Sequence, residues 1–158
     1  MGQSSKGACV LYTDGGSRGN PGPAGSGIVL LGPSGETICG GGRFIGSATN
    51  NVAEYDALIW GLGLARDHGC RELEVRMDSE LIVRQMTGRY RVKNEGLKPL
   101  FATAKGLLAS FQKVRFVHVR RENNTEADRY ANEAMDVRGP VGDAEEPVCR
   151  IGEQDALF

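Results

Sequence analysis

The sequence predicts a single α/β domain whose sheet begins with an antiparallel meander and continues with strands parallel to its first strand. Two observations support this fold class. The N-terminal part of the chain contains β-forming segments separated by turns rich in glycine and proline. Beyond them, segments with apolar residues at helical spacing alternate with short strand-like segments, which is typical of βαβ units. At 158 residues, the chain is long enough to bury one core.

The first strand is predicted from residues 9–13 (CVLYT), which run directly into Asp14 and then into a turn rich in glycine, asparagine and proline. Such an apolar run is typical of a strand buried on both faces, so we expect Asp14 at the C-terminal edge of the sheet. Residues 26–31 and 36–44 predict two further strands, joined by the turn at residues 32–35. These three strands form the predicted meander.

A helix is predicted over residues 52–65, with Asn50 or Asn51 as its N-cap. Glu54 lies on a helical stripe that suits packing on a sheet. The stripe comprises Glu54, Leu58, Gly61 and Ala65. A carboxylate on such a stripe is either the partner of Asn51 in a capping box or a functional group, and the local sequence leaves both interpretations open.

A further strand is predicted over residues 72–77, followed by Asp78 and a short helix over residues 80–86. By itself, Asp78 could be an N-cap of that helix. If the strand lies parallel to the first strand and is joined to it by the crossover helix, however, Asp14 and Asp78 leave the sheet at the same edge. Open α/β sheets place their functional sites at this edge.

The rest of the predicted domain consists of a helix over residues 97–111, a strand over residues 114–119 and a helix that Thr125 caps. Asp128 then falls at the third position of the last helix. It is either the acidic partner in a capping box with Thr125 or a fourth functional carboxylate.

The four cysteines lie far apart in the sequence and form no CxxC pair, so the spacing predicts neither a zinc site nor a disulfide framework. We interpret them as small core or surface residues. They are Cys9, Cys39, Cys70 and Cys149.

The net charge of −1 is unevenly distributed, because residues 1–135 carry a net charge of +3. A basic segment contributes to this excess and contains Arg84, Arg89, Arg91, Lys93 and Lys98. It is either an ordinary solvated face or a contact surface for nucleic acid. No apolar run approaches the length of a membrane span, and the N-terminus lacks the apolar core of a signal peptide, so we expect a cytoplasmic protein. We also expect it to be a monomer.

The four carboxylates share one property: each falls at the end of a strand or in the first turn of a helix. If they converge, they repel one another by several kcal/mol in a partly desolvated cleft unless cations neutralise them. Mg²⁺ prefers such oxygen ligands, and two ions about 4 Å apart can activate a water and stabilise the leaving oxygen of a phosphodiester. The sequence thus supports a hypothesis of metal-dependent phosphoryl transfer.

Four segments, in this order and spacing, resemble the signature segments of type 1 ribonuclease H: TDGGSRGNPGPAGSG, TNNVAEYDALIWGL, MDSELIVRQM and RRENNTEADRYANEA. The resemblance covers about residues 10–135. It implies a mixed five-stranded sheet with helices on both faces. It also implies endonucleolytic hydrolysis of the RNA strand of RNA–DNA hybrids, leaving 5′-phosphate and 3′-hydroxyl ends.

Carried over by position, the resemblance implies a site for two Mg²⁺ ions, with Mn²⁺ as an alternative metal. The implied ligands are Asp14, Glu54, Asp78 and Asp128. Recognition of 2′-hydroxyl groups would distinguish RNA from DNA. The implied contacts to the hybrid are Gly15, Gly16, Asn20, Thr49 and Asn51.

The sequence departs from many family members in two places. The link before the last helix is short and contains no histidine, and His118 lies inside the predicted last strand, so we interpret His118 as structural. Arg121 is instead the candidate for contacting the scissile phosphate, as in a subgroup with this short link. A long basic protrusion is also missing. The residues expected to replace it partly, with weak and salt-dependent binding, are Arg84, Arg89, Arg91 and Lys93.

We expect a catalytic domain over residues 1–136 and an acidic, flexible tail over residues 137–158. The tail ends in QDALF, which resembles the pentapeptide by which bacterial proteins bind the sliding clamp. Its implied contact residues are Gln154, Leu157 and Phe158. A tail without a partner is the alternative.

Two other functions remain open. One is a related metal nuclease or resolvase that acts on DNA, because the same carboxylate fold serves such enzymes. The matches at Asn20, Thr49 and Asn51 favour RNA instead. The other is a non-catalytic hybrid-binding module tethered to the clamp, which the presence of all four carboxylates disfavours.

Overall fold

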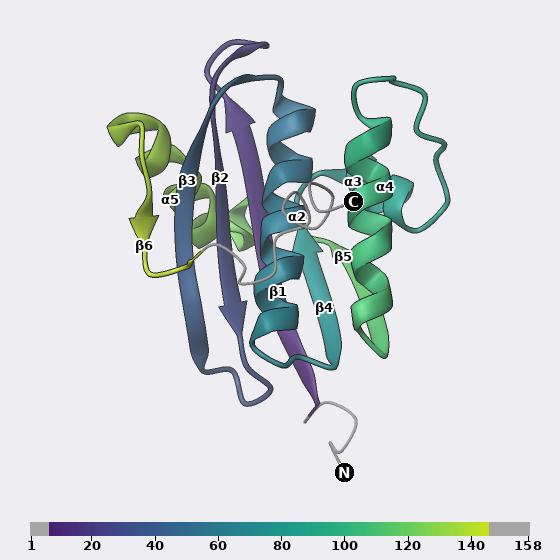
Figure 1. The fold of residues 1–158 in the computed structure, drawn as a ribbon. Coiled ribbons are helices and arrows are strands. Elements are labelled where there is room, and N and C mark those ends of the chain that lie inside the picture. Colours follow the sequence, from purple (N-terminus) through teal and green to yellow (C-terminus); the bar gives the residue numbers. More distant parts are fainter. Residues whose placement is uncertain (1–6, 146–158) are drawn as a thin grey trace, which may run out of the picture.

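The computed structural model describes residues 7–145, which form a mixed sheet with helices on both faces (Figure 1). The strands of this part of the chain are β1 (Ala8–Ser17), β2 (Gly22–Leu31), β3 (Thr37–Ala48), β4 (Glu72–Met77), β5 (Lys113–His118) and β6 (Val141–Gly142). Its helices are α2 (Asn50–Asp67), α3 (Glu80–Met86), α4 (Lys98–Leu107) and α5 (Thr125–Val137), with 3₁₀ turns η1 (Leu108–Ser110) and η2 (Arg121–Asn123). None of the described helices is both long enough and apolar enough to cross a membrane.

The strand order is β5-β4-β1-β2-β3-β6. β1 pairs antiparallel with β2, and β2 pairs antiparallel with β3, so the predicted meander is confirmed. β4 lies parallel to both β1 and β5. Because Thr13 of β1 is in register with Met77 of β4, Asp14 and Asp78 follow at the same edge of the sheet, as the crossover argument predicts.

The main core lies between the sheet and α2. Leu58 of α2 is fully buried, and Gly61 lies so close to the sheet that a Cβ atom there would come within 2.8 Å of the Leu11 side chain. The predicted apolar stripe therefore packs against β1. On the opposite face, α5 crosses β1, β2 and β3 (Figure 1). Its backbone reaches the sheet because glycines face it: a Cβ at Gly27 would lie 2.0 Å from the Ala127 carbonyl oxygen.

The caps of two helices differ from the prediction. Thr49, rather than Asn50 or Asn51, caps α2, and its side chain accepts a hydrogen bond from the Val52 backbone N–H at 3.2 Å. The N-cap of α5 is Asn124, so the predicted cap at Thr125 is wrong. A short polar residue stands at each of these neighbouring positions, and the sequence pattern does not distinguish which one adopts the non-helical backbone conformation.

The sheet has a sixth strand where a flexible tail was expected. β6 pairs antiparallel with β3, opposite Gly41 and Gly42, in the described part of the chain. The Gly40 N–H donates to the Asp143 carboxylate at 2.9 Å, and the Trp60 indole N–H donates to the Glu145 carbonyl at 2.9 Å. Residues 137–145 are therefore part of the folded domain, and the expected boundary after residue 136 is too early. The remainder of the expected tail lies outside the described residues.

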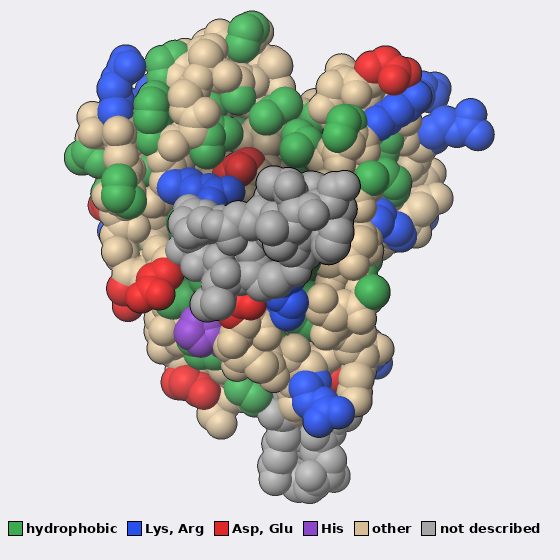
Figure 2. All heavy atoms as spheres, in the orientation of Figure 1, with side chains coloured by type: hydrophobic (Ala, Val, Ile, Leu, Met, Phe, Trp, Pro, Cys, Tyr) green, Lys and Arg blue, Asp and Glu red, His purple; other side chains and the backbone are tan. Residues whose placement is uncertain are grey.

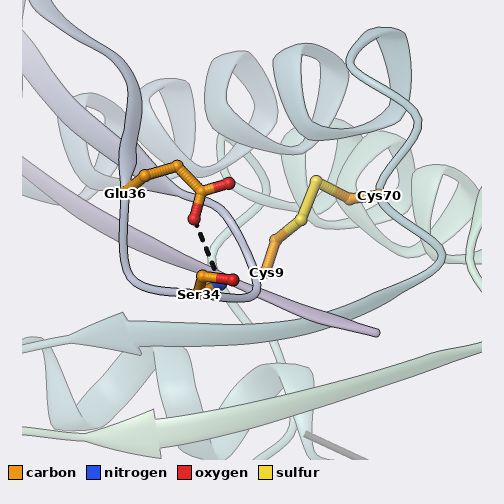
Figure 3. Close-up of a disulfide and its surroundings, with 4 residues drawn as sticks. All are labelled: Cys9, Ser34, Glu36 and Cys70. Atoms are coloured by element: carbon orange, nitrogen blue, oxygen red, sulfur yellow. Dashed lines mark hydrogen bonds between the residues drawn. A yellow bond between two sulfur atoms is a disulfide. The ribbon is translucent and has the colours of Figure 1, made fainter. Parts of the chain in front are cut away.

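Cys9 and Cys70 form a disulfide, contrary to the interpretation of the cysteines as unpaired (Figure 3). The bond joins the start of β1 to the segment between α2 and β4. Sequence spacing does not reveal this pair because the two cysteines are 61 residues apart and meet only through the crossover connection. Cys39 is buried and free.

Candidate active site

The predicted carboxylates converge at the C-terminal edge of β1 and β4. Asp14 lies on β1, Glu54 lies in α2 and Asp78 directly follows β4. Each of these three carboxylates offers an oxygen atom, and the three oxygens lie within 4.8 Å of one another. Asp128 of α5 lines the same cleft and interacts with Asp14 through its side chain. The structure therefore brings the four residues together from four separate elements.

The cluster strongly disfavours its own negative charge. Burial, followed by the charges of Glu54 and Asp78, raises the pKa of Asp14 to about 9. Burial, followed by the charge of Asp78, raises the pKa of Glu54 to about 8, against the opposing effects of the Gly15 N–H and Arg121. Without a cation, Asp14 and Glu54 therefore retain protons near neutral pH.

Gly15 determines how closely α2 approaches β1. A Cβ atom at this position would lie 2.2 Å from the Ala53 carbonyl oxygen, which is a backbone atom and cannot rotate away. The close approach also allows the Gly15 N–H to donate to Glu54 Oε1 at 3.2 Å. Glu54 is thus held by the sheet, and the predicted capping box with Asn51 is not needed to explain it. The functional interpretation of Glu54 stays a prediction.

The carboxylates open into a cleft of about 500 Å³. Besides the four carboxylates, it is lined by Gly15, Gly16, Ser17, Arg18, Asn50, Arg121, Ala131, Asn132 and Met135. Arg121 belongs to η2, between the end of β5 and α5, and its positive charge lowers the pKa of Glu54. Arg121 therefore lies beside the carboxylates, whereas its contact with the scissile phosphate and its role in catalysis stay predictions.

The glycine-rich turn after β1 is fastened to the start of α2. The Ser17 N–H donates to Asn50 Oδ1 at 2.8 Å, and the Asn50 N–H donates to Asn20 Oδ1 at 3.1 Å. The side-chain oxygens of Asn20 and Thr49 thus already accept backbone hydrogen bonds in the free protein. Asn51 is half-buried in the first turn of α2. These predicted contact residues shape the rim of the cleft.

The basic segment lies apart from the carboxylates. Lys and Arg side chains gather over the loop that connects α3 and α4 (Figure 2). Arg84 pairs with Glu80 at 2.6 Å and stacks over Tyr90. Together with Arg89 and His118, it lines a second cleft of about 290 Å³. Arg91 and Lys93 are exposed in the loop, so the segment is accessible to a large ligand.

His118 is exposed at the end of β5 and does not line the cleft of the carboxylates. The prediction that His118 lies outside the cleft of the carboxylates agrees with the structure. Because the side chain is exposed, however, it does not pack in the core.

Sequence reasoning missed several polar residues in the cleft or next to its carboxylates. Arg18 forms an ion pair with Asp136 at 2.7 Å and reaches Asn132 of α5. Asn132 in turn donates to the Asp128 carbonyl at 3.0 Å. Asn124 is buried and donates to Asp78. Arg18 stands inside the glycine-rich motif and could have been noticed there, whereas nothing in the sequence indicates that Asn132 lines the cleft or that Asn124 contacts Asp78.

The chemistry of the donor set fits a divalent cation. All the candidate ligand atoms are carboxylate oxygens, which are the hard ligands that Mg²⁺ and Mn²⁺ prefer. The raised pKa values of Asp14 and Glu54 show that these groups lack sufficient positive charge in the protein alone. No histidine or cysteine belongs to the described cluster, so a site for a softer metal is not indicated.

Comparison with known proteins agrees with this geometry. The profile of the family described as reverse transcriptase-like matches residues 12–134. Bifunctional protein Rv2228c of Mycobacterium tuberculosis is 45% identical over 143 residues, which are 90% of this chain and 39% of that protein. The chain therefore spans well under half the length of this relative.

Two solved structures cover the chain more evenly. RNase H1 from the halophilic archaeon Halobacterium salinarum is 45% identical and superposes with a TM-score of 0.80, over 82% of this chain and 98% of that one. LC11-RNase H1, solved in complex with an RNA/DNA hybrid, is 47% identical with a TM-score of 0.78, over 82% of this chain and 98% of that one. In sequence and in fold alike, the chain belongs to the ribonuclease H family.

Proposed function

We propose that the chain is an endonuclease that hydrolyses the RNA strand of RNA–DNA hybrids and leaves 5′-phosphate and 3′-hydroxyl ends. The observation that carries this proposal is the cluster of Asp14, Glu54 and Asp78, whose oxygens lie within 4.8 Å of one another at the base of an open cleft. The relative LC11-RNase H1, which was solved with an RNA/DNA hybrid, supports the choice of substrate.

The four carboxylates would hold two Mg²⁺ ions, with Mn²⁺ as an alternative metal. Bound there, divalent ions supply Lewis-acid stabilisation of charge on the attacking and leaving oxygens of the phosphodiester. The protein's part is to hold Asp14, Glu54, Asp78 and Asp128 in place before the substrate arrives. The hydrogen bond from the Gly15 N–H to Glu54 and the rigid strand that carries Asp14 perform this task.

Arg121 supplies a fixed positive charge on the wall of the cleft. Its guanidinium group can donate paired hydrogen bonds to a phosphate, so it would orient the scissile phosphate over the carboxylates. Its influence on the pKa of Glu54 supports a position close to the reacting groups.

The hybrid itself would lie across the glycine-rich turn and the start of α2. Gly15 and Gly16 line the cleft with backbone atoms, which lets a nucleic-acid strand approach closely. Asn20, Thr49 and Asn51 would contact 2′-hydroxyl groups and phosphates. The basic segment would contact phosphates farther along the hybrid through Arg84, Arg89, Arg91 and Lys93.

The test is cleavage of an end-labelled RNA–DNA hybrid by the wild type and by Asp14→Asn. We expect cleavage of the RNA strand by the wild type in Mg²⁺, none in EDTA, and a loss of activity in the variant of several orders of magnitude. Cleavage of a DNA-only duplex would identify a DNA nuclease instead. Hybrid binding without cleavage would identify a non-catalytic module.

We also propose that the C-terminal QDALF binds a sliding clamp. The catalytic domain that precedes it would be a monomer. Gln154, Leu157 and Phe158 lie outside the described residues, so the support for clamp binding is the sequence motif alone. Unchanged clamp binding after deletion of Leu157 and Phe158 would exclude this contact. The disulfide between Cys9 and Cys70 counts against a reducing cytoplasm, where such bonds are rare.

A further inference from the structure

Asn124 is a buried polar side chain for which the chemistry above gives no role. It lies between η2 and α5, and only 2% of its surface is exposed. An asparagine directly before a helix usually accepts a helix N–H with its side-chain oxygen. The Asn124 side chain forms no such capping bond. Its amide is directed toward the sheet and the carboxylates instead.

The Asn124 amide connects two of the elements that carry the carboxylates. Its Nδ2 donates to the Thr13 carbonyl oxygen at 2.9 Å, directly before Asp14 on β1. The same Nδ2 donates to Asp78 Oδ2 at 3.2 Å, directly after β4. The Asn124 backbone carbonyl accepts from the Asp128 N–H at 3.2 Å. One residue therefore contacts Asp78 itself, the residue before Asp14, and the backbone of Asp128.

The position requires a hydrogen-bond donor rather than only a side chain of this size. Asn124 Oδ1 has no hydrogen-bond partner among the described residues. A buried amide oxygen without a partner costs about 1–3 kcal/mol, and an apolar side chain of the same shape avoids that cost. Such a side chain, however, supplies no N–H for the Thr13 carbonyl or for Asp78.

We propose that Asn124 is a positioning residue that fixes the Asp78 carboxylate relative to Asp14, so that the cluster is ready to bind divalent metal. The proposal rests on the proposed function, because it takes the carboxylate cluster as the metal site. Groups that hydrogen-bond to a metal ligand fix its orientation, and their loss weakens metal binding on the order of 10–100-fold. The Asp78 Oδ2 contact places Asn124 in this role.

The test compares Asn124→Leu, Asn124→Ala and the matched control Asn123→Ala in the full-length chain. Asn123 is exposed and lines no part of the catalytic cleft. Thermal unfolding in EDTA shows whether each variant folds, and calorimetric titration with Mn²⁺ measures metal binding without substrate. We expect both Asn124 variants to fold and to bind Mn²⁺ on the order of 10–100-fold more weakly than the wild type. The control should stay within about twofold of the wild type, since it loses no contact to a carboxylate.

Hybrid cleavage then separates metal positioning from a general defect. The Asn124 variants should need a correspondingly higher Mg²⁺ concentration for half-maximal cleavage, with an unchanged KM for the hybrid. Folded variants that bind Mn²⁺ as tightly as the wild type would overturn the proposal, and so would failure of both variants to fold in EDTA. Hybrid cleavage by the wild type tests the proposed function independently, because it does not depend on Asn124.

Discussion

At the scale of single residues, Asp14 shows how the site disfavours negative charge. It is 7% exposed and shares its cleft with three other carboxylates. Its pKa of about 9 and the pKa of about 8 of Glu54 lie far above the values near 4 that these groups have in an unfolded chain. The folded protein therefore binds more protons than the unfolded chain throughout the pH range between these values.

This difference predicts how stability depends on pH and metal. Stability of the metal-free protein should fall as pH rises from about 5 to about 9, because the unfolded chain has already lost the two protons that the folded protein must still release. Mg²⁺ should raise the melting temperature most at the alkaline end. Asp14→Asn should melt a few degrees higher than the wild type in EDTA at pH 8, since the asparagine does not need to take up a proton when the chain folds. Calorimetric scans across pH check this, and a flat profile in EDTA would contradict it.

Activity measurements can distinguish a catalytic role of Arg121 from one of His118. Arg121 lines the catalytic cleft, whereas His118 is exposed at the end of β5 and lines the second cleft. Arg121→Ala should therefore lower kcat on the order of 10²-fold, as loss of a donor to a reacting phosphate does. His118→Ala should lower it little. Steady-state kinetics on a labelled hybrid decide between them, and the opposite ranking would assign the catalytic role to His118.

At the scale of elements, glycines set the distance between α5 and the sheet. A Cβ at Gly27 would lie 2.0 Å from the Ala127 carbonyl oxygen, and a Cβ at Gly42 would lie 2.2 Å from the Tyr130 carbonyl oxygen. Backbone atoms cannot rotate away as side chains can. Any added side chain must therefore displace α5. Since Asp128 belongs to α5, the displacement also moves Asp128 within the cleft.

Gly27→Ala should cost about 1–3 kcal/mol of stability through overpacking and should also weaken Mn²⁺ binding, because Asp128 moves with α5. The control is Gly106→Ala in α4, where nothing lies within 4 Å of the added atom. That change should stabilise the protein by about 0.5–1 kcal/mol, since alanine loses less backbone entropy in a helix. Urea unfolding measures both. A Gly27→Ala protein as stable as the wild type would disprove the close-approach argument.

The sequence predicts elements better than it predicts contacts between them. Hydrophobic periodicity places β1, β4 and α2, and the crossover rule brings Asp14 and Asp78 to one edge. The role of Asn124 was not predictable, because an asparagine before a helix looks like an ordinary cap until its amide is seen to point at Asp78. β6 was missed because Val141 and Gly142 are too short a run to show any alternation.

At the scale of the whole molecule, the disulfide encloses β1, β2, β3 and α2 in one covalent loop. Cys9 and Cys70 are 61 residues apart, and a loop of this length stabilises a fold by about 4 kcal/mol through restriction of the unfolded chain. Reductant should therefore lower the denaturation midpoint of the wild type by a corresponding amount. The double variant Cys9→Ser, Cys70→Ser should not respond to reductant. Equal midpoints for the wild type with and without reductant would show that the bond contributes nothing.

The hydrogen bond from the Trp60 indole to the Glu145 carbonyl limits the distance between the carboxylate cluster and any protein bound to QDALF. It holds Glu145 against α2, the helix that also carries Glu54. Trp60 and Glu54 are six residues apart, which is about 9 Å along the helix axis. Residues 146–153 can span at most about 29 Å when fully extended. A protein that bound QDALF would therefore be held within about 29 Å of Glu145 and, through the Trp60 contact, close to the helix that carries Glu54.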